Sequence, residues 1–245
     1  MNQKWLLVLG ANSDMALASA RRFAEAGWNL YLASRQTEFL EKEVDHLKIA
    51  YRIEAEALYF DAEDFDSHLP FYTGLRQKPQ GVLLAFGFMP EQEQAQQQPV
   101  LLRKTANVNY LGAMSILEVV ASDFEQRQVG WIAAISSVAG DRGRASNYIY
   151  GSSKAALSAY LAGLRHRLFA AGVHVMTVKP GFVATKMTRG LDLPDKLTAQ
   201  PKEVAEAIFK GIDKRKNTLY VKGIWRLIML IIIYLPEFIF KKTKL

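Results

Sequence analysis

Short apolar runs alternate along the chain with longer segments whose apolar residues recur at helical spacing. Runs typical of buried strands occur at residues 5–10, 29–34, 54–61, 81–87, 130–137 and 173–181. Between them, segments 14–27, 101–127 and 150–172 have the length and spacing of multi-turn helices. Continuously apolar strands that alternate with helices are typical of a parallel sheet covered on both faces. The pattern therefore predicts an α/β fold with a doubly wound parallel sheet, whose ligands bind beyond the carboxyl ends of the strands.

The C-terminal segment departs from this pattern. The stretch "RLIMLIIIYLPEFIFKK", residues 226–242, is strongly apolar and lies between basic residues. Its unbroken apolar core covers only residues 227–235, whereas a membrane-spanning helix needs about 20 apolar residues. We therefore divide the chain into a domain at 1–222 and an apolar, basic-flanked tail at 223–245, and we expect the tail not to cross a bilayer.

Composition narrows the function classes. The chain has 245 residues and no cysteine, which excludes disulfides, thiolate metal sites and a cysteine nucleophile. The four histidines are scattered, so no metal site is predicted. Too few apolar residues precede the first glycine for a secretory signal, and we expect a cytoplasmic protein.

The positive charge is concentrated near the C-terminus. Of the net charge of +7, residues 201–245 carry +6. The basic run "KRK" at 214–216 has no interleaved aromatic residues, so nucleic-acid binding is not expected. A basic segment that also contains an apolar run favours contact with an anionic membrane.

The turn after the first predicted strand is a candidate phosphate site. Residues 5–9 run into "GANSDMA" and then a helix, where phosphates would meet free backbone N–H groups and the helix dipole. Gly10 suits the tight turn, but Asp14 and Ala16 stand where further glycines would be expected. The alternative is an ordinary turn, with the helix capped by Asn12, Ser13 or Asp14.

The end of the second strand indicates which nucleotide would bind. A carboxylate there would hold the ribose hydroxyls of NAD, but the sequence has Ser34 and Arg35. A guanidinium suits a 2′-phosphate, so NADP(H) is favoured and NAD(H) is the alternative. Asp61, at the end of the third strand, is a candidate to accept a hydrogen bond from adenine or to cap the next helix.

The stretch "SSVAGDRGRASNYIYGSSKAAL", residues 136–157, carries candidate acid–base chemistry. Tyr150 and Lys154 are four residues apart, on one face of a predicted helix. A tyrosine has a pKa near 10, and a nearby ammonium lowers it toward the working range. Ser137, at the tip of a strand, could hydrogen-bond a carbonyl, and Asn109 is an unfavourable residue inside a helix.

These residues together resemble the short-chain dehydrogenase/reductase family. Gly10 with its helix, Asn109-x-x-Gly112, Ser137, Tyr150-x-x-x-Lys154 and "PGFVAT" at 180–185 have the family's order and spacing, over about residues 5–215. The resemblance implies a Rossmann fold and hydride transfer between a nicotinamide and a carbonyl/alcohol pair. It implies that Tyr150 is the acid–base residue, Lys154 lowers its pKa and holds the ribose, and Ser137 polarises the carbonyl. Asn109 would anchor a water that relays protons to Lys154.

The same resemblance implies a set of cofactor-binding residues. They are Gly10, Asn12, Ser13, Asp14, Met15, Ser34, Arg35, Asp61, Ala62, Ala85, Phe86, Gly87, Tyr150, Lys154, Pro180, Gly181, Val183 and Thr185. The sequence departs from the family twice: only the first glycine of the phosphate loop is kept, and "AFG" at 85–87 replaces the usual "NNAG". The first departure implies that pyrophosphate binding depends on Asn12, Ser13 and backbone N–H groups.

Several short stretches resemble one branch of the family, which reduces decaprenylphosphoryl-2-keto-arabinose, a keto-sugar on a polyprenyl phosphate. They are "AFG" at 85–87, "NY" at 109–110, residues 136–155 and "PGFVATKM" at 180–187, whereas "SRQ" at 34–36 departs from the branch. This branch implies a lipid-linked substrate. Apart from this resemblance, Arg142, Arg144 and Arg189 are candidate phosphate contacts. The alternatives are another lipophilic ketone, such as a steroid-like or acyl substrate, and a nucleotide-binding scaffold without turnover.

The tail fits an interfacial helix. Trp225, Tyr234 and Phe238 would lie near the headgroups, and Arg226, Lys241, Lys242 and Lys244 would face anionic lipid. A peripheral position of residues 224–245 on the inner face of the cell membrane would suit a lipid-linked substrate. The alternative is that the tail completes the substrate pocket or packs against another subunit. The family resemblance also implies a homodimer or homotetramer built through residues 103–127 and 150–171.

Overall fold

A single parallel sheet organises the protein in the computed structural model, which describes residues 4–190 and 192–243. Its strands are β1 (Trp5–Leu9), β2 (Asn29–Ser34), β3 (Ala55–Tyr59), β4 (Gly81–Leu84), β5 (Trp131–Ile135), β6 (His174–Lys179) and β7 (Thr218–Tyr220). They lie in the order β3-β2-β1-β4-β5-β6-β7, and every pairing is parallel. The predicted doubly wound α/β fold is confirmed. The short strand β7 was not predicted from the hydropathy pattern.

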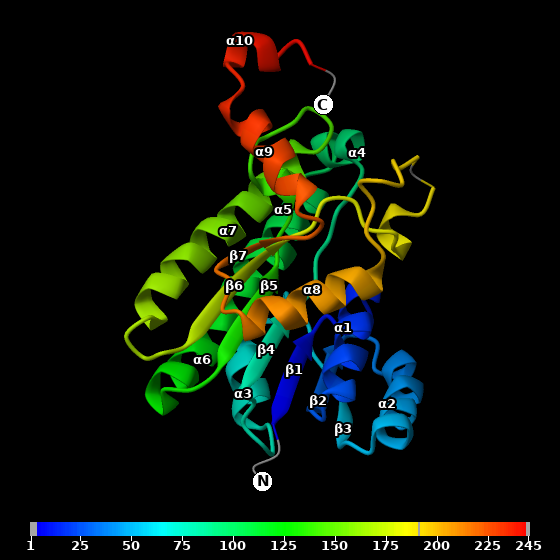
Figure 1. Cartoon of the computed structure of the whole chain (residues 1–245), viewed down its shortest axis with the longest axis vertical. Helices are drawn as coiled ribbons and strands as arrows, with labels where there is room; N and C mark the ends of the chain where they lie inside the picture. Colours follow the sequence, from blue (N-terminus) through cyan, green and yellow to red (C-terminus); the bar gives the residue numbers. More distant parts are fainter. Residues whose placement is uncertain (1–3, 191, 244–245) are drawn as a thin grey trace.

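Helices cover both faces of the sheet (Figure 1). On one face, α1 (Asp14–Glu25), α2 (Glu38–Tyr51) and α8 (Pro201–Asp213) enclose one apolar core. On the other, α3 (His68–Thr73), α6 (Gly112–Arg127) and α7 (Tyr148–Leu168) enclose a second. Because both faces are buried, the strands are apolar throughout, as β1 and β5 show. The chain adds β2 and β3 on one side of β1 and then returns to add β4 on the other side, so the strand order reverses between β1 and β4. A ligand crevice is expected at such a switch point.

The segment predicted as one helix over 101–127 is divided. After α4 (Gln92–Gln97), the helix α5 (Pro99–Ala106) passes into a π-helical turn, η2 (Asn107–Leu111), before α6 begins. The turn places Asn109 so that its side-chain amide hydrogen-bonds the backbone of Phe88. Hydropathy spacing predicts the helical path but not this local widening, which is common at functional sites.

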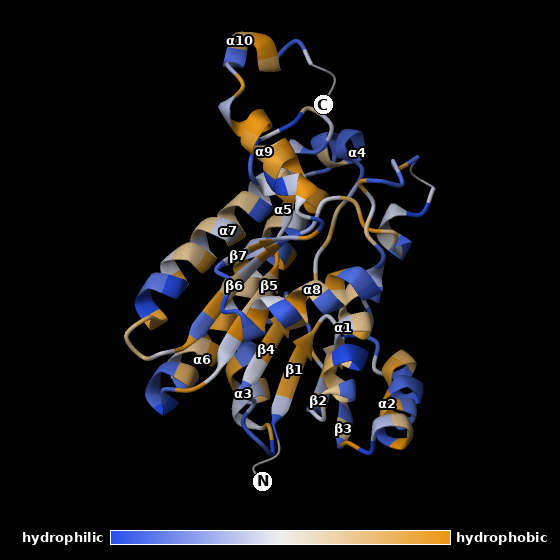
Figure 2. Ribbon diagram, in the orientation of Figure 1, coloured by the Kyte–Doolittle hydropathy of each residue, from blue (hydrophilic) through white to orange (hydrophobic). Residues whose placement is uncertain are grey.

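Two helices form the tail beyond β7: α9 (Ile224–Tyr234) and α10 (Glu237–Phe240). They extend at the end of the molecule where the loops follow the strands (Figure 1) and are predominantly hydrophobic (Figure 2). In the described part of the chain, no helix is both long and apolar enough to span a bilayer. The remaining short elements are the 3-10 turns η1 (Phe65–Ser67), η3 (Val138–Gly140) and η4 (Lys186–Thr188).

Candidate active site

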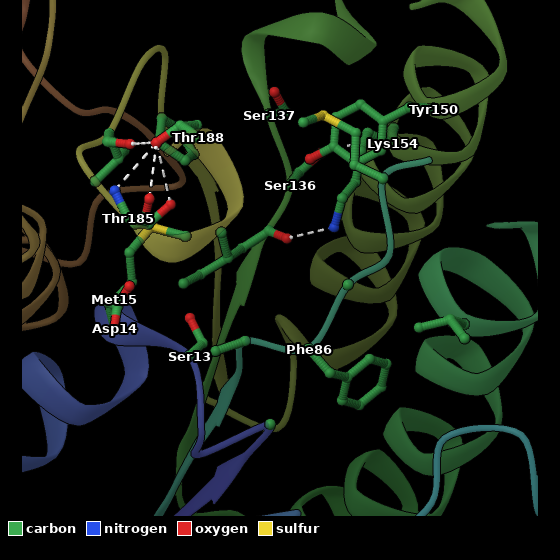
Figure 3. Close-up of a pocket in the computed structure, with 18 of the residues that line it drawn as sticks. Ser13, Asp14, Met15, Phe86, Ser136, Ser137, Tyr150, Lys154, Thr185 and Thr188 are labelled. Atoms are coloured by element: carbon green, nitrogen blue, oxygen red, sulfur yellow. Dashed lines mark hydrogen bonds between the residues drawn. The ribbon is translucent and has the colours of Figure 1, made fainter. Parts of the chain in front are cut away.

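A cavity of about 630 Å³ lies at the carboxyl edge of the sheet. Nearly all of the predicted site residues line it, from the turn after β1 to the loop after β6. They are Gly10, Asn12, Ser13, Asp14, Met15, Ser34, Arg35, Asp61, Ala62, Ala85, Phe86, Gly87, Ser137, Tyr150, Lys154, Pro180, Gly181, Val183 and Thr185. Figure 3 shows the turn with Ser13 and Met15 on one side of this cavity and Ser137 with Tyr150 on the other. The cavity thus has a nucleotide end, formed by the turn after β1 and Arg35, and a chemical end, formed by Ser137, Tyr150 and Lys154.

Gly10 is fixed by both its conformation and its neighbour. Its φ is +83°, and a Cβ there would lie 2.4 Å from the Phe86 backbone nitrogen. Any other residue would therefore be strained and would push the turn off the end of β4. Behind this turn, Ser13 is the N-cap of α1 but makes no side-chain capping bond. The first N–H groups of α1 are consequently suited to an anion.

The turn is tied to the end of β2 by an amide. Asn12 donates a hydrogen bond from Nδ2 to Ser34 Oγ at 2.8 Å and to the Gln36 carbonyl at 3.1 Å. Its NH₂ group therefore holds the loop after β2, and a role of Asn12 in pyrophosphate binding stays a prediction. Arg35 lies exposed between these partners at the cavity rim. The Asn12 contacts hold the backbone that presents the Arg35 guanidinium.

The carboxylate at a usual glycine position has a structural partner. Asp14 Oδ2 accepts from the Lys186 backbone N–H at 2.7 Å, which ties the start of α1 to the loop after β6. That loop is also closed on itself, because Thr188 Oγ1 donates to the Val183 carbonyl at 2.6 Å and accepts from the Thr185 N–H at 3.1 Å (Figure 3). Asp14 therefore holds the loop after β6 against the start of α1, a contact that a glycine at this position, having no side chain, could not make.

Tyr150 and Lys154 lie on one face of α7, as predicted. The Lys154 Nζ is 5.8 Å from the centre of the Tyr150 ring and donates to the Ile135 carbonyl at 3.0 Å (Figure 3). Burial raises the pKa of Tyr150 to about 12, and its hydrogen bond with Ser137 acts to lower it. Burial also lowers the pKa of Lys154 to about 8. Burial therefore outweighs the lowering of the tyrosine pKa that was predicted from Lys154.

Asn109 does not line the cavity. Its Oδ1 accepts from the Phe88 N–H at 2.7 Å, and its Nδ2 donates to the Phe88 carbonyl at 2.7 Å and to Ser153 Oγ at 3.0 Å. A Cβ at Gly87 would be 3.4 Å from both Asn109 Oδ1 and Lys154 Nζ, so the two groups flank this glycine. The amide therefore clamps the chain after β4 beside Lys154.

The tail contributes a wall of the cavity. Trp225 is only 4% exposed, its Nε1 donates to the Leu197 carbonyl at 3.0 Å, and its ring occupies the space a Cβ on Gly181 would need. The expectation that Trp225 lies at a membrane surface is therefore wrong. An apolar run does not indicate which face of its helix packs inward, and Trp225 lies on the inward face.

The three arginines predicted as phosphate contacts lie in different places. Arg142 turns toward the tail, donating to the carbonyls of Ile232 at 2.6 Å and Leu235 at 2.5 Å and pairing with Glu237 at 2.8 Å. Arg189 is exposed outside the cavity, whereas Arg144 lines it. Lining residues that the sequence did not indicate are Gln36, Phe60, Met89, Val108, Ile135, Ser136, Val138, Ala139, Asn147, Phe182, Lys186, Thr188 and Trp225. Several of them lie inside the stretches 136–157 and 180–187 but had no assigned role, and Trp225 comes from the tail.

The family assignment follows from comparison with known proteins. Residues 4–195 match the short chain dehydrogenase family model. An uncharacterized oxidoreductase of Streptomyces coelicolor is 36% identical over 97% of this chain and 94% of its own length. Another from Mycobacterium tuberculosis is 30% identical over 97% and 96%. The chain therefore belongs to the short-chain dehydrogenase/reductase family of oxidoreductases.

A solved structure agrees with the fold. The short-chain dehydrogenase from Sphingobium yanoikuyae in complex with NADPH superposes with a TM-score of 0.78 at 24% identity, covering 92% of each chain. At this identity the likeness concerns the fold, and the site rests on the residues of this chain.

Proposed function

We propose that the protein is an NADP(H)-dependent reductase that converts a carbonyl to an alcohol. The observation that carries the proposal is that Ser137, Tyr150 and Lys154 share one cavity with Arg35 and the start of α1. Family membership and the NADPH complex of the Sphingobium protein support it. The bound nicotinamide would supply the hydride, and the protein would supply binding, orientation and the proton.

The nucleotide end fits NADP(H). The unspent N–H groups at the start of α1 suit the pyrophosphate, and the exposed Arg35 suits a 2′-phosphate. Strand β2 ends in Ser34, so no carboxylate stands there to repel that phosphate or to hold the ribose hydroxyls of NAD. Asp61 Oδ1 caps the Glu63 N–H at 3.0 Å, and its other oxygen is left for the adenine.

At the chemical end, the phenol of Tyr150 is the proton donor. Because burial raises the pKa of Tyr150 to about 12, its proton is in place at pH 7 for transfer to a carbonyl oxygen. Ser137 Oγ accepts from the Ala139 N–H at 3.1 Å and is also hydrogen-bonded to the Tyr150 phenol, so its hydroxyl proton would have to turn to the carbonyl oxygen to polarise it when substrate binds. Lys154 holds its position through Ile135 and would contact the nicotinamide ribose.

The chemical assignment is tested by Tyr150→Phe. We expect turnover of a ketone to fall by about 10²- to 10⁴-fold, since the general acid is lost, while NADPH affinity is unchanged. A non-catalytic scaffold would bind NADPH and show the same negligible turnover in both proteins.

The nucleotide end is tested in parallel by titrating NADPH and NADH. Arg35→Ala should weaken NADPH binding by about 10- to 100-fold, the worth of a charged hydrogen bond, and leave NADH binding unchanged. Equal affinity of the wild-type protein for both cofactors would contradict the assignment of Arg35.

For the substrate, we propose a lipophilic carbonyl compound taken from an anionic membrane surface, with a polyprenyl-phosphate-linked keto-sugar as the leading case. This proposal rests on the tail, whose outer face is apolar beside the cavity wall that Trp225 forms. Leu227, Leu230, Ile231, Tyr234 and Phe238 are between 54% and 77% exposed. Exposed Arg226, Lys241 and Lys242 flank this face, and Lys244 lies outside the described residues. The homo-oligomer implied by the family stays a prediction.

A further inference from the structure

Two polar side chains of the cavity have no part in the proposed reduction. Arg144 and Asn147 belong to the loop between Ser137 and Tyr150, and both line the cavity. The other arginine of this loop, Arg142, is used by the tail. The loop thus sends one guanidinium outward to the tail and one inward, close in the chain to the catalytic tyrosine.

Both inward side chains carry buried polar atoms without a partner. Among the described residues, nothing hydrogen-bonds to Arg144 Nε or to Asn147 Oδ1, and both atoms are shielded from solvent. Burial lowers the pKa of Arg144, although the charge of Asp141 acts to raise it. That carboxylate is engaged elsewhere, by Lys179 Nζ and by the Tyr220 hydroxyl at 2.9 Å. Since arginine stays charged in proteins, Arg144 is a half-buried cation whose shielded Nε has no partner in the described part of the chain, and the Asp141 carboxylate is paired elsewhere.

The surroundings make an unpaired cation costly. The lining of the same cavity includes Val138, Phe182 and Trp225, which form an apolar cluster with the tail. In such a medium an unpaired charge is strongly disfavoured, and an oxyanion that reached it would be bound more firmly than in water. A protein retains such a group where a ligand supplies the missing charge.

We propose that Arg144 and Asn147 form a substrate subsite for an oxyanion, a phosphate ester or a carboxylate, carried close to the reacting carbonyl. The Arg144 guanidinium binds the anion, and Asn147 Oδ1 accepts from a hydroxyl of the same substrate. This inference rests on the proposed carbonyl reduction and adds the charge of the substrate. The phosphates of the cofactor have their own partners, at Arg35 and the start of α1.

Binding to the protein saturated with NADP⁺ tests the subsite without turnover. We would titrate phenyl phosphate and benzoate by calorimetry into wild type, Arg144→Gln and the matched control Arg52→Gln, an exposed arginine at the end of α2. We expect at least one anion to bind wild type and the control alike and to bind Arg144→Gln at least tenfold more weakly. Absence of binding to wild type, or equal binding to all three, would overturn the proposal.

Kinetics separate the subsite from the reductase activity. With NADPH, 4-acetylphenyl phosphate and 4-acetylbenzoate are compared with neutral acetophenone, and the two anionic ketones distinguish phosphate from carboxylate. Arg144→Gln should raise KM for the preferred anionic ketone at least tenfold and change acetophenone reduction less than threefold. Equal loss on both kinds of ketone would overturn the subsite while leaving carbonyl reduction intact. If no ketone is reduced, the proposed function fails and the binding titration alone decides the subsite.

Thermal unfolding distinguishes a ligand site from a structural arginine. Without a ligand, Arg144→Gln should melt at a higher temperature than wild type, because a half-buried cation with an unpaired Nε is removed. A lower melting temperature together with unchanged anion binding would show that Arg144 serves the fold instead.

Discussion

At the scale of single residues, Lys154 shows most clearly a conflict between burial and charge. Its side chain is almost fully buried and has the Ile135 carbonyl as its hydrogen-bond partner, and burial lowers its pKa to about 8. The ordinary lysine pKa is about 10.4. Between these pH values the unfolded chain binds more protons than the native state, so native stability rises with pH across this window.

We therefore predict that Lys154→Met is more stable than wild type at pH 7. The gain should be about 3 kcal/mol, less what is lost with the hydrogen bond to Ile135, and it should shrink as the pH rises from 8 to 10.5. Urea unfolding at a series of pH values measures the gap, with the exposed Lys48→Met as a matched control. A gap that is constant with pH would contradict a buried, charged Lys154.

At the scale of elements, α9 is an apolar helix with one buried face and one exposed face. Trp225, Met229 and Ile232, spaced by four and three residues, face inward and pack with Val138. Leu230 and its neighbours on the opposite face stay exposed. The hydropathy of the run is the same on both faces, so only packing decides which face forms the cavity wall.

The two faces of α9 should respond differently to truncation. Trp225→Ala is expected to lower the free energy of unfolding by about 3–5 kcal/mol, because a buried ring and its hydrogen bond to Leu197 are lost. Ile231→Ala, 67% exposed on the outer face, should change it by less than about 0.5 kcal/mol. Urea unfolding measures both. Similar losses would mean that the outer face is covered in solution.

At the scale of the whole molecule, charge and apolar surface are placed at the same end. Helices α9 and α10 lie beyond the carboxyl edge of the sheet (Figures 1 and 2). Trp225 of α9 lines the cavity, and the outer face of both helices is exposed. The flanking basic residues would each contribute about 1 kcal/mol at an anionic membrane surface. Arg142 holds this tail to the loop between Ser137 and Tyr150, so the tail and the site are mechanically joined.

We predict that the protein floats with vesicles containing phosphatidylglycerol and dissociates as salt is raised, because screening weakens the basic contacts. The double variant Leu230→Asn, Ile231→Asn should float several-fold less. Ile49→Asn, at an exposed apolar position on α2, is the matched control. A wild-type protein that never floats would show that the membrane proposal is wrong, and its mass in solution would then report whether a second copy covers the tail.

The sequence by itself indicated six of the seven strands, the paths of α1, α6 and α7, and most of the residues that line the cavity. Continuous apolar strands must be buried on both faces, and the spacing of Tyr150 and Lys154 on a helix places them on one face. Such motifs can be recognised without the tertiary structure, because each depends on local geometry. The positions at strand ends, such as Ser34 and Ser137, follow from the rule that parallel strands end at one edge.

Only the tertiary structure decided how spare polar groups and apolar faces are used. It paired Asn12 with Ser34, set Asn109 against Phe88, turned Trp225 into the cavity wall and left Arg144 inside it without a partner. These outcomes depend on which residues distant in the chain come into contact, and hydropathy or spacing cannot encode that. The physical reason is that a side chain's partner is fixed by packing in three dimensions, whereas its secondary structure is fixed largely by its neighbours in sequence.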